Sequence, residues 1–152
     1  MDLIEAIITD IYTLITDDAD MRILMGGSVE ERGEWLYEEL DEVDPEFPYL
    51  VHSFEEETAG TDPGFANGFY TVDAWVYCEK RADKEKLYRI RGRLAELLGE
   101  RYLTNPIYTY CFLWLEGRGR RMPTDNTQVK RYSLPFEARF ARTQEIKSIL
   151  AR

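Results

Sequence analysis

Two long segments in which apolar and polar residues alternate, residues 69–79 and 129–141, constrain the fold most. A period of two predicts β-strands with one apolar face. Further strands are expected at residues 49–55 and 108–116, the latter apolar on both faces and therefore central. The strands at residues 49–55 and 69–79 are joined by a long connection at residues 56–68, which predicts an antiparallel hairpin with an extended tip. Strands with one apolar face need a second layer to cover that face.

Helical patterns supply that layer. Apolar residues recur at intervals of three and four along residues 2–16 and again along residues 83–100. We therefore predict an α+β fold, with an about four-stranded antiparallel sheet and two main helices packed on one face. The chain is expected to form a single domain over residues 1–152, with a compact core at 1–141 and a C-terminal tail at 142–152 that frays or docks as a helix.

The segment between the first helix and the first strand is ambiguous. Ser28 and Glu31 form the pattern of a helix capping box, whereas Trp35 and Tyr37 suit a short edge strand equally well. Residues 21–27 are expected to form a short apolar turn closed by two glycines, and residues 38–46 an acidic surface loop.

Two features of the second half of the chain, a glycine- and arginine-rich segment and a proline in the last strand, also predict local structure. Residues 117–127 are expected to form a turn or loop. Pro135 indicates that the last strand lies at an edge or carries a bulge at that point, because proline lacks the N–H that a sheet requires.

Charge is distributed unevenly along the chain. The net charge is −10, but residues 1–60 hold eighteen acids and two arginines, for −16, whereas residues 61–152 hold eleven acids and seventeen Lys or Arg, for +6. Oppositely charged halves favour head-to-tail contact between copies. The alternative is that both halves fold together and the charges intermix. Aromatic residues make up 13% of the chain, and ten of the twenty are tyrosine, a composition that suits both sheets and interfaces.

Most catalytic and metal sites are excluded by counting. His52 is the single histidine, so sites that need two or three imidazoles are excluded. Its neighbour Ser53 points to the opposite face of a strand, so the two side chains cannot form a catalytic pair. His52 is therefore expected to be structural or on the surface. Cys78 and Cys111 are expected to be buried free thiols. The acidic runs match no calcium loop, and no glycine loop precedes a helix to hold a phosphate. We expect no enzyme activity, no cofactor and no metal.

The start of the chain bears on location. Residues 1–20 have no basic leader and carry acids through their apolar run. The sequence therefore predicts neither a signal peptide nor a membrane span, and no membrane partner.

Taken together, the order of these segments resembles the tail-completion, or tail-terminator, proteins of tailed phages. The likeness covers residues 1–141 and rests on the N-terminal helix, the strand Pro48-Tyr-Leu-Val-His, the strand Gly68-Phe-Tyr-Thr-Val-Asp-Ala-Trp-Val-Tyr, and the polar break Glu79-Lys-Arg-Ala-Asp before the second helix. The family has no short invariant motif. The long acidic stretch at residues 29–46 departs from it, which leaves the fold and contacts of that stretch open.

The resemblance implies a ring, usually of six copies, at the head-proximal end of a virion tail. Its partners would be further copies of itself, the tail tube protein and a neck or head-completion protein, and DNA would only pass through. Assembly would take place in the cytoplasm of the bacterial host. Candidate interaction residues lie in two loops: Glu57, Asp62 and Phe65 in the first, and Arg118, Arg120 and Arg121 in the second. The arginines would pair with acidic patches on a neighbour, or contact nucleic acid.

Other functions remain open at this stage. A neck or head-closure protein of a virion would have the same kind of small α+β fold. An acidic DNA-mimic inhibitor of a nucleic-acid enzyme would account for the −16 half. A small hydrolase is disfavoured, because no base or nucleophile is placed for one.

Overall fold

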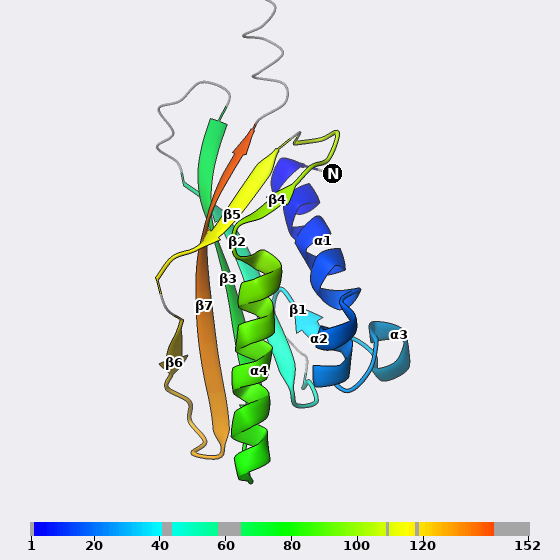
Figure 1. Ribbon diagram of the computed structural model, residues 1–152, viewed down its shortest axis with the longest axis vertical. Coiled ribbons are helices and arrows are strands. Elements are labelled where there is room, and N and C mark those ends of the chain that lie inside the picture. Colours follow the sequence, from blue (N-terminus) through cyan, green and yellow to red (C-terminus); the bar gives the residue numbers. More distant parts are fainter. Residues whose placement is uncertain (1, 41–43, 58–64, 109, 118, 142–152) are drawn as a thin grey trace, which may run out of the picture.

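One mixed sheet forms the centre of the molecule in the computed structural model, which describes residues 2–40, 44–57, 65–108, 110–117 and 119–141 (Figure 1). Its strands follow the order β1-β2-β3-β7-β5-β4, and β6 pairs with β7 outside that path. The strands are β1 (Leu36–Tyr37), β2 (Tyr49–Glu56), β3 (Phe65–Tyr77), β4 (Arg101–Leu103), β5 (Cys111–Leu115), β6 (Arg120–Met122) and β7 (Val129–Ala141). The pairing of β1 with β2 is parallel, and all other pairs are antiparallel.

The two longest strands, β3 and β7, pair along their whole length. Thirteen residue pairs run from Phe65 opposite Ala141 to Tyr77 opposite Val129. Because side chains alternate along a strand, this register puts Tyr70 and Phe136 on one face of the sheet, where both are fully buried. The bounds of β7 are those that the alternation predicted.

The long helices α1 (Leu3–Thr16) and α4 (Arg81–Leu98) cover one face of the sheet, as the sequence predicted (Figure 1). An Asp2–Glu5 capping box satisfies the first backbone N–H groups of α1. The apolar stripe of each helix is buried against the strands, with Ile7, Ile11 and Ile15 from α1 and five residues from α4: Leu87, Ile90, Leu94, Leu97 and Leu98.

The sheet is larger than the four strands predicted. The described residues form seven strands, of which β1, β4 and β6 have two or three residues each. Segments this short show no period, so alternation could not reveal them. The prediction that residues 117–127 form only a turn or loop is therefore wrong for β6, and β1 adds a parallel pair to a sheet that was expected to be antiparallel.

The region before β2 contains both of the alternatives. Ser28 caps a one-turn helix, α3 (Val29–Arg32), and β1 follows directly. The predicted turn at residues 21–27 is partly helical instead, since α2 (Ala19–Leu24) ends there and two glycines with positive φ follow it. Asp18 starts this helix by accepting a hydrogen bond from the Met21 N–H.

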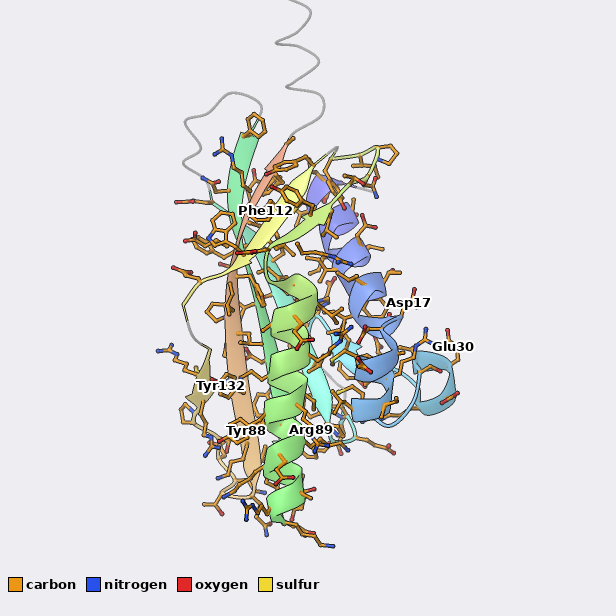
Figure 2. The ribbon with its side chains drawn as sticks, in the orientation of Figure 1. Asp17, Glu30, Tyr88, Arg89, Phe112 and Tyr132 are labelled. Carbon is orange, nitrogen blue, oxygen red and sulfur yellow. The ribbon has the colours of Figure 1, made fainter. Side chains whose placement is uncertain are left out.

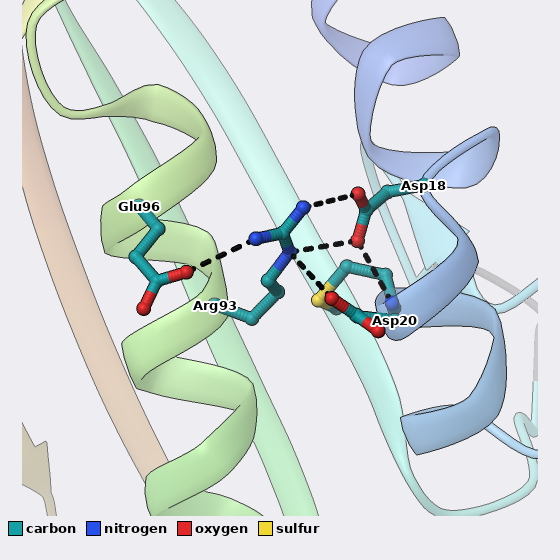
Figure 3. A network of polar contacts seen from close by, with 5 residues as sticks. Asp18, Asp20, Arg93 and Glu96 are labelled. Carbon is teal, nitrogen blue, oxygen red and sulfur yellow. Dashed lines mark hydrogen bonds and ion pairs between the residues drawn. The ribbon is translucent and has the colours of Figure 1, made fainter.

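A polar network joins α2 to α4 (Figure 3). The Arg93 guanidinium donates from Nε and Nη2 to the two carboxylate oxygens of Asp18, at 2.9 and 2.6 Å. Asp20 and Glu96 contact the same guanidinium at 3.7 and 3.0 Å. Asp18 therefore caps one helix and binds the other.

Pro135 does not mark an edge of the sheet. β7 is flanked by β3 along its whole length, and on its other side by β6 at residues 131–133 and β5 at residues 136–140. Pro135 falls in the gap between these two shorter strands, where a missing N–H costs no ladder bond. The C-terminal tail that the sequence predicts at 142–152 lies outside the described residues.

Candidate functional site

The face of the sheet opposite α1 and α4 carries many aromatic side chains. At the β4–β5 end, the Tyr102 and Phe112 rings lie 4.4 Å apart, and Phe112 stacks on Trp114 at 5.7 Å. Figure 2 labels Phe112 on β5. Phe69 is 40% exposed on the same face. A sheet face this rich in partly exposed aromatic rings is typical of a protein-interaction surface.

The other half of this face is also aromatic. Trp75 stacks on Tyr49 at 5.8 Å, and the Arg131 guanidinium lies 4.9 Å from the Trp75 ring while donating from Nε to Asp73 at 2.8 Å. A pocket of 370 Å³ borders these residues together with Phe47. Asp73 Oδ1 and Trp75 Nε1 are buried without a hydrogen-bond partner among the described residues, so a water molecule or a partner group would have to satisfy them.

The structure separates the two loops that the sequence singled out. Glu57 and Phe65 lie where β2 ends and β3 begins, whereas Arg120 and Arg121 lie on β6. Phe65 pairs with Ala141 and Arg120 with Ser133, eight residues earlier on β7, so the two groups are about 26 Å apart along the strand. Asp62 and Arg118 lie outside the described residues. The candidate residues do not form one site.

Arg121 belongs to a cluster of arginines and tyrosines between β6 and α4. Its Nη2 lies 3.4 Å from the Tyr88 hydroxyl, and the Arg91 guanidinium donates to the Tyr132 hydroxyl at 3.0 Å and stacks over both tyrosine rings. In the part of the chain that the structure describes, neither arginine forms an ion pair with a carboxylate. Among the described residues, the cluster therefore holds two guanidinium groups with no carboxylate at ion-pair distance.

The sequence analysis missed Tyr88 and Arg91. They lie three residues apart on α4, a spacing that places two side chains on one helix face. A tyrosine within the charged side of that helix was the available indication of such a cluster. It could not be connected to Arg121 until β6 was placed beside β7.

Negative charge gathers on the opposite side of the molecule, around α3 and β1. The exposed carboxylates there are Glu30, Glu31, Glu34, Glu38 and Glu39. Figure 2 shows Glu30 on α3, on the side of the molecule away from Tyr88 and Tyr132. Burial, followed by the charges of Glu34 and Glu30, raises the pKa of Tyr12. The acidic cluster around α3 and β1 and the basic cluster at β6 therefore lie on different surfaces, whereas Asp18 and Asp20 of the acidic half pair with Arg93 of the basic half.

A pocket of 310 Å³ opens beside β1. Its lining combines the carboxylates of Glu34 and Glu38 with Leu36, with His52, and with three residues of α1, namely Ile8, Thr9 and Tyr12. The pocket thus has an acidic rim and an apolar floor, a combination that suits the long side chain of a lysine or arginine.

His52 is 2% exposed, and its Nδ1 lies 2.7 Å from the Tyr70 hydroxyl. Burial lowers the pKa of His52 to about 4, so the imidazole is neutral at pH 7. Cys78 and Cys111 are buried free thiols, as expected, and burial raises the pKa of Cys111 to about 12. These groups belong to the core.

No three His, Cys, Asp or Glu side chains among the residues placed by the structure come together in a way that could hold a metal ion. No helix in those same parts of the chain is both long enough and apolar enough to cross a membrane.

Comparison with known proteins bears on the fold. No protein-family model matches the chain, and no curated protein matches it. Among solved structures, a chain from "Virion of native gene transfer agent (GTA) particle" has a similar fold, with a TM-score of 0.61 and 16% sequence identity. The match covers 86% of this chain and 91% of that chain. At this identity the likeness concerns the fold.

Proposed function

We propose that this chain is a structural protein of a phage-like virion, and more narrowly the tail-completion protein that caps the tail tube. The observation that carries the proposal is the fold it shares with a chain of a gene transfer agent virion over 91% of that chain's length. The likeness extends over nearly the whole domain and not only a common substructure. The proposal includes no catalytic role and no cofactor.

In this role the protein forms a ring, of six copies by analogy with the tail-completion family. The ring sits at the head-proximal end of the tail, stops the growth of the tube and joins it to the neck, and DNA passes through it. Assembly takes place in the host cytoplasm, and the product stays in the virion tail. The placement of opposite charges at opposite edges of the sheet supports head-to-tail closure, because each copy then offers a complementary edge to the next.

The uncovered aromatic face supports a second contact. A sheet face with Phe69 40% exposed and Tyr102 64% exposed is costly to leave in water. In the proposed assembly, the tube protein or the neck protein covers part of this face.

The test uses tail tubes from the same particle. Purified protein is added to growing tubes, and tube length is followed by electron microscopy, with bovine serum albumin as the control. The proposal predicts tubes that stop growing and carry extra density at one end. Binding to a portal ring in place of tubes would identify a neck or head-closure protein instead. Salt-sensitive binding only to a basic nucleic-acid enzyme would favour the DNA-mimic alternative.

A further inference from the structure

One row of paired residues crosses the sheet from β1, which Glu34 and Glu38 flank, to Arg121 in β6. Backbone pairing connects Leu36 in β1 through Leu50, Ala74 and Tyr132 to Arg121 in β6. Four strand spacings separate the two ends, or about 19 Å. In the part of the chain that the structure describes, no strand lies beyond either end. β1 and β6 are therefore edge strands at the same level of the sheet.

The basic edge is formed by β6 and the adjoining side of α4. Arg121 is exposed, and its 3.4 Å contact with the Tyr88 hydroxyl is the one hydrogen bond that its guanidinium forms with a described side chain. The neighbouring Arg91 adds a second positive charge. Because the contact with Tyr88 is long and exposed, the Arg121 side chain can turn outward at little cost.

The acidic edge offers a recess on the matching side of the sheet. Leu36 and Arg121 belong to one row, so their side chains lie on the same face, the face covered by helices. The 310 Å³ pocket beside β1 opens on that face, with Glu34 and Glu38 at Leu36. An arginine that approaches at this level meets two carboxylates at the entrance to the pocket.

Strand direction also fits contact between copies. β6 runs antiparallel to β7, and β1 runs in the same direction as β7 because two antiparallel pairings and one parallel pairing lie between them. Two copies in the same orientation would therefore bring β6 and β1 together as antiparallel edges. No copy has to be inverted, which is the condition for a closed ring with identical contacts.

We propose that Arg121 at the β6 edge of one copy enters the pocket beside β1 of the next copy and pairs there with Glu34 and Glu38. This assignment rests on the proposed ring and identifies the contact that closes it. The occupant is a second copy of this chain, because both complementary edges belong to the same chain, at the same level and on the same face. A desolvated arginine between two carboxylates contributes strongly to such a contact.

The test uses the full chain and measures assembly by sedimentation velocity. Arg121→Glu is expected to raise the protein concentration at half assembly by about tenfold or more, because it places like charges at the junction. Arg120→Glu is the matched control. It makes the same charge change one residue earlier, where the side chain lies on the opposite face, and a smaller shift is expected. Unchanged thermal melts show that both variants are folded.

A charge swap provides the decisive comparison. The chain that combines Arg121→Glu with Glu34→Lys and Glu38→Lys carries both reversed charges, and it should assemble like the wild type. Arg121→Glu copies alone, or Glu34→Lys, Glu38→Lys copies alone, should assemble poorly, because each then places like charges at its own junction. An equal mixture of the two should form rings in which they alternate, because the Arg121→Glu edge meets the two lysines and the native Arg121 of the other copy meets Glu34 and Glu38. A mixture that assembles no better than either variant alone would overturn the assignment.

The remaining outcomes separate the two proposals. Wild-type assembly that Arg121→Glu does not change would refute this contact and leave the proposed ring intact. A wild type that stays monomeric at high concentration and in the presence of tubes would refute the ring itself. If Arg121→Glu left assembly unchanged but abolished binding to a DNA oligonucleotide, the arginine would have a phosphate partner and the assignment would be wrong.

Discussion

Replacing Asp18 should destabilise the fold more than replacing any other acid near α2. Asp18 caps α2, which is worth about 1 kcal/mol, and forms two hydrogen bonds to the Arg93 guanidinium, worth about 1.5–3 kcal/mol to a charged group. The side chains of Asp18 and Arg93 are only 11% and 27% exposed, so solvent screens the pair weakly. Arg93 keeps Glu96 and Asp20 as partners, which softens the loss.

For Asp18→Ala we therefore expect a loss of about 2–4 kcal/mol in the free energy of unfolding. That loss lowers the melting temperature by roughly 5–12 °C in a chain of this size. Asp18→Asn keeps a good helix cap but loses the charge and one of the two oxygens that accept from Arg93, so its melt should fall between the wild type and Asp18→Ala. Asp17→Ala is the control, because that carboxylate is 68% exposed and has one 3.4 Å contact with Arg22.

Acid should remove the same contribution. The hydrogen bonds from Arg93 lower the pKa of Asp18, so its stabilising effect is present above the unfolded-state pKa, about 4, and is lost as the pH falls through the lower folded-state pKa. The difference between wild type and Asp18→Ala, measured by urea unfolding, should shrink as the pH falls below the unfolded-state pKa, about 4. Equal melts for the Asp17→Ala and Asp18→Ala variants at pH 7 would refute this reasoning.

Three further predictions concern the core. Burial lowers the pKa of His52 to about 4, whereas the unfolded-state value is about 6.5, so the free energy of unfolding should fall by up to about 3 kcal/mol as the pH drops from about 6.5 to about 4. A His52→Gln variant whose stability keeps the same pH dependence would contradict this. Cys111 is fully buried, and burial raises its pKa to about 12, so this thiol should react with a thiol reagent at least about 100-fold more slowly in the native protein than in the urea-unfolded chain. Equal rates would show that the site opens. Phe140 is fully buried and packs edge-on against Phe54, with the ring centroids 5.7 Å apart, so Phe140→Ala should lower the free energy of unfolding by about 3–5 kcal/mol, measured by chemical denaturation. A loss below about 1 kcal/mol would place that ring outside the core.

The regular parts of the fold were predictable because their pattern is long. Alternation over thirteen residues located β7 correctly to the residue, and intervals of three and four located α1 and α4 to within two residues at each end. The short strands were not predictable in this way. β6 is held by its pairing with β7, a contact between segments that the sequence pattern does not connect.

The interaction surfaces were only half predictable. Arg120 and Arg121 were identified from the sequence, and the uneven charge of the two halves was visible as a sum. Their arrangement was not, since the placement of Arg121 level with Leu36 depends on the register of four strand pairs. The pocket between Glu34 and Glu38 likewise exists only because α1 packs beside β1.

The proposed function depends most on how copies of this chain meet at the end of a tail. Electron cryomicroscopy of tail tubes incubated with the full-length protein tests this directly. We predict a closed ring at one end of the tube, in which β6 of each copy faces β1 of the next and Arg121 density reaches the Glu34–Glu38 pocket. Tubes with bare ends, or a ring whose copies touch through other surfaces with both edges facing solvent, would contradict it.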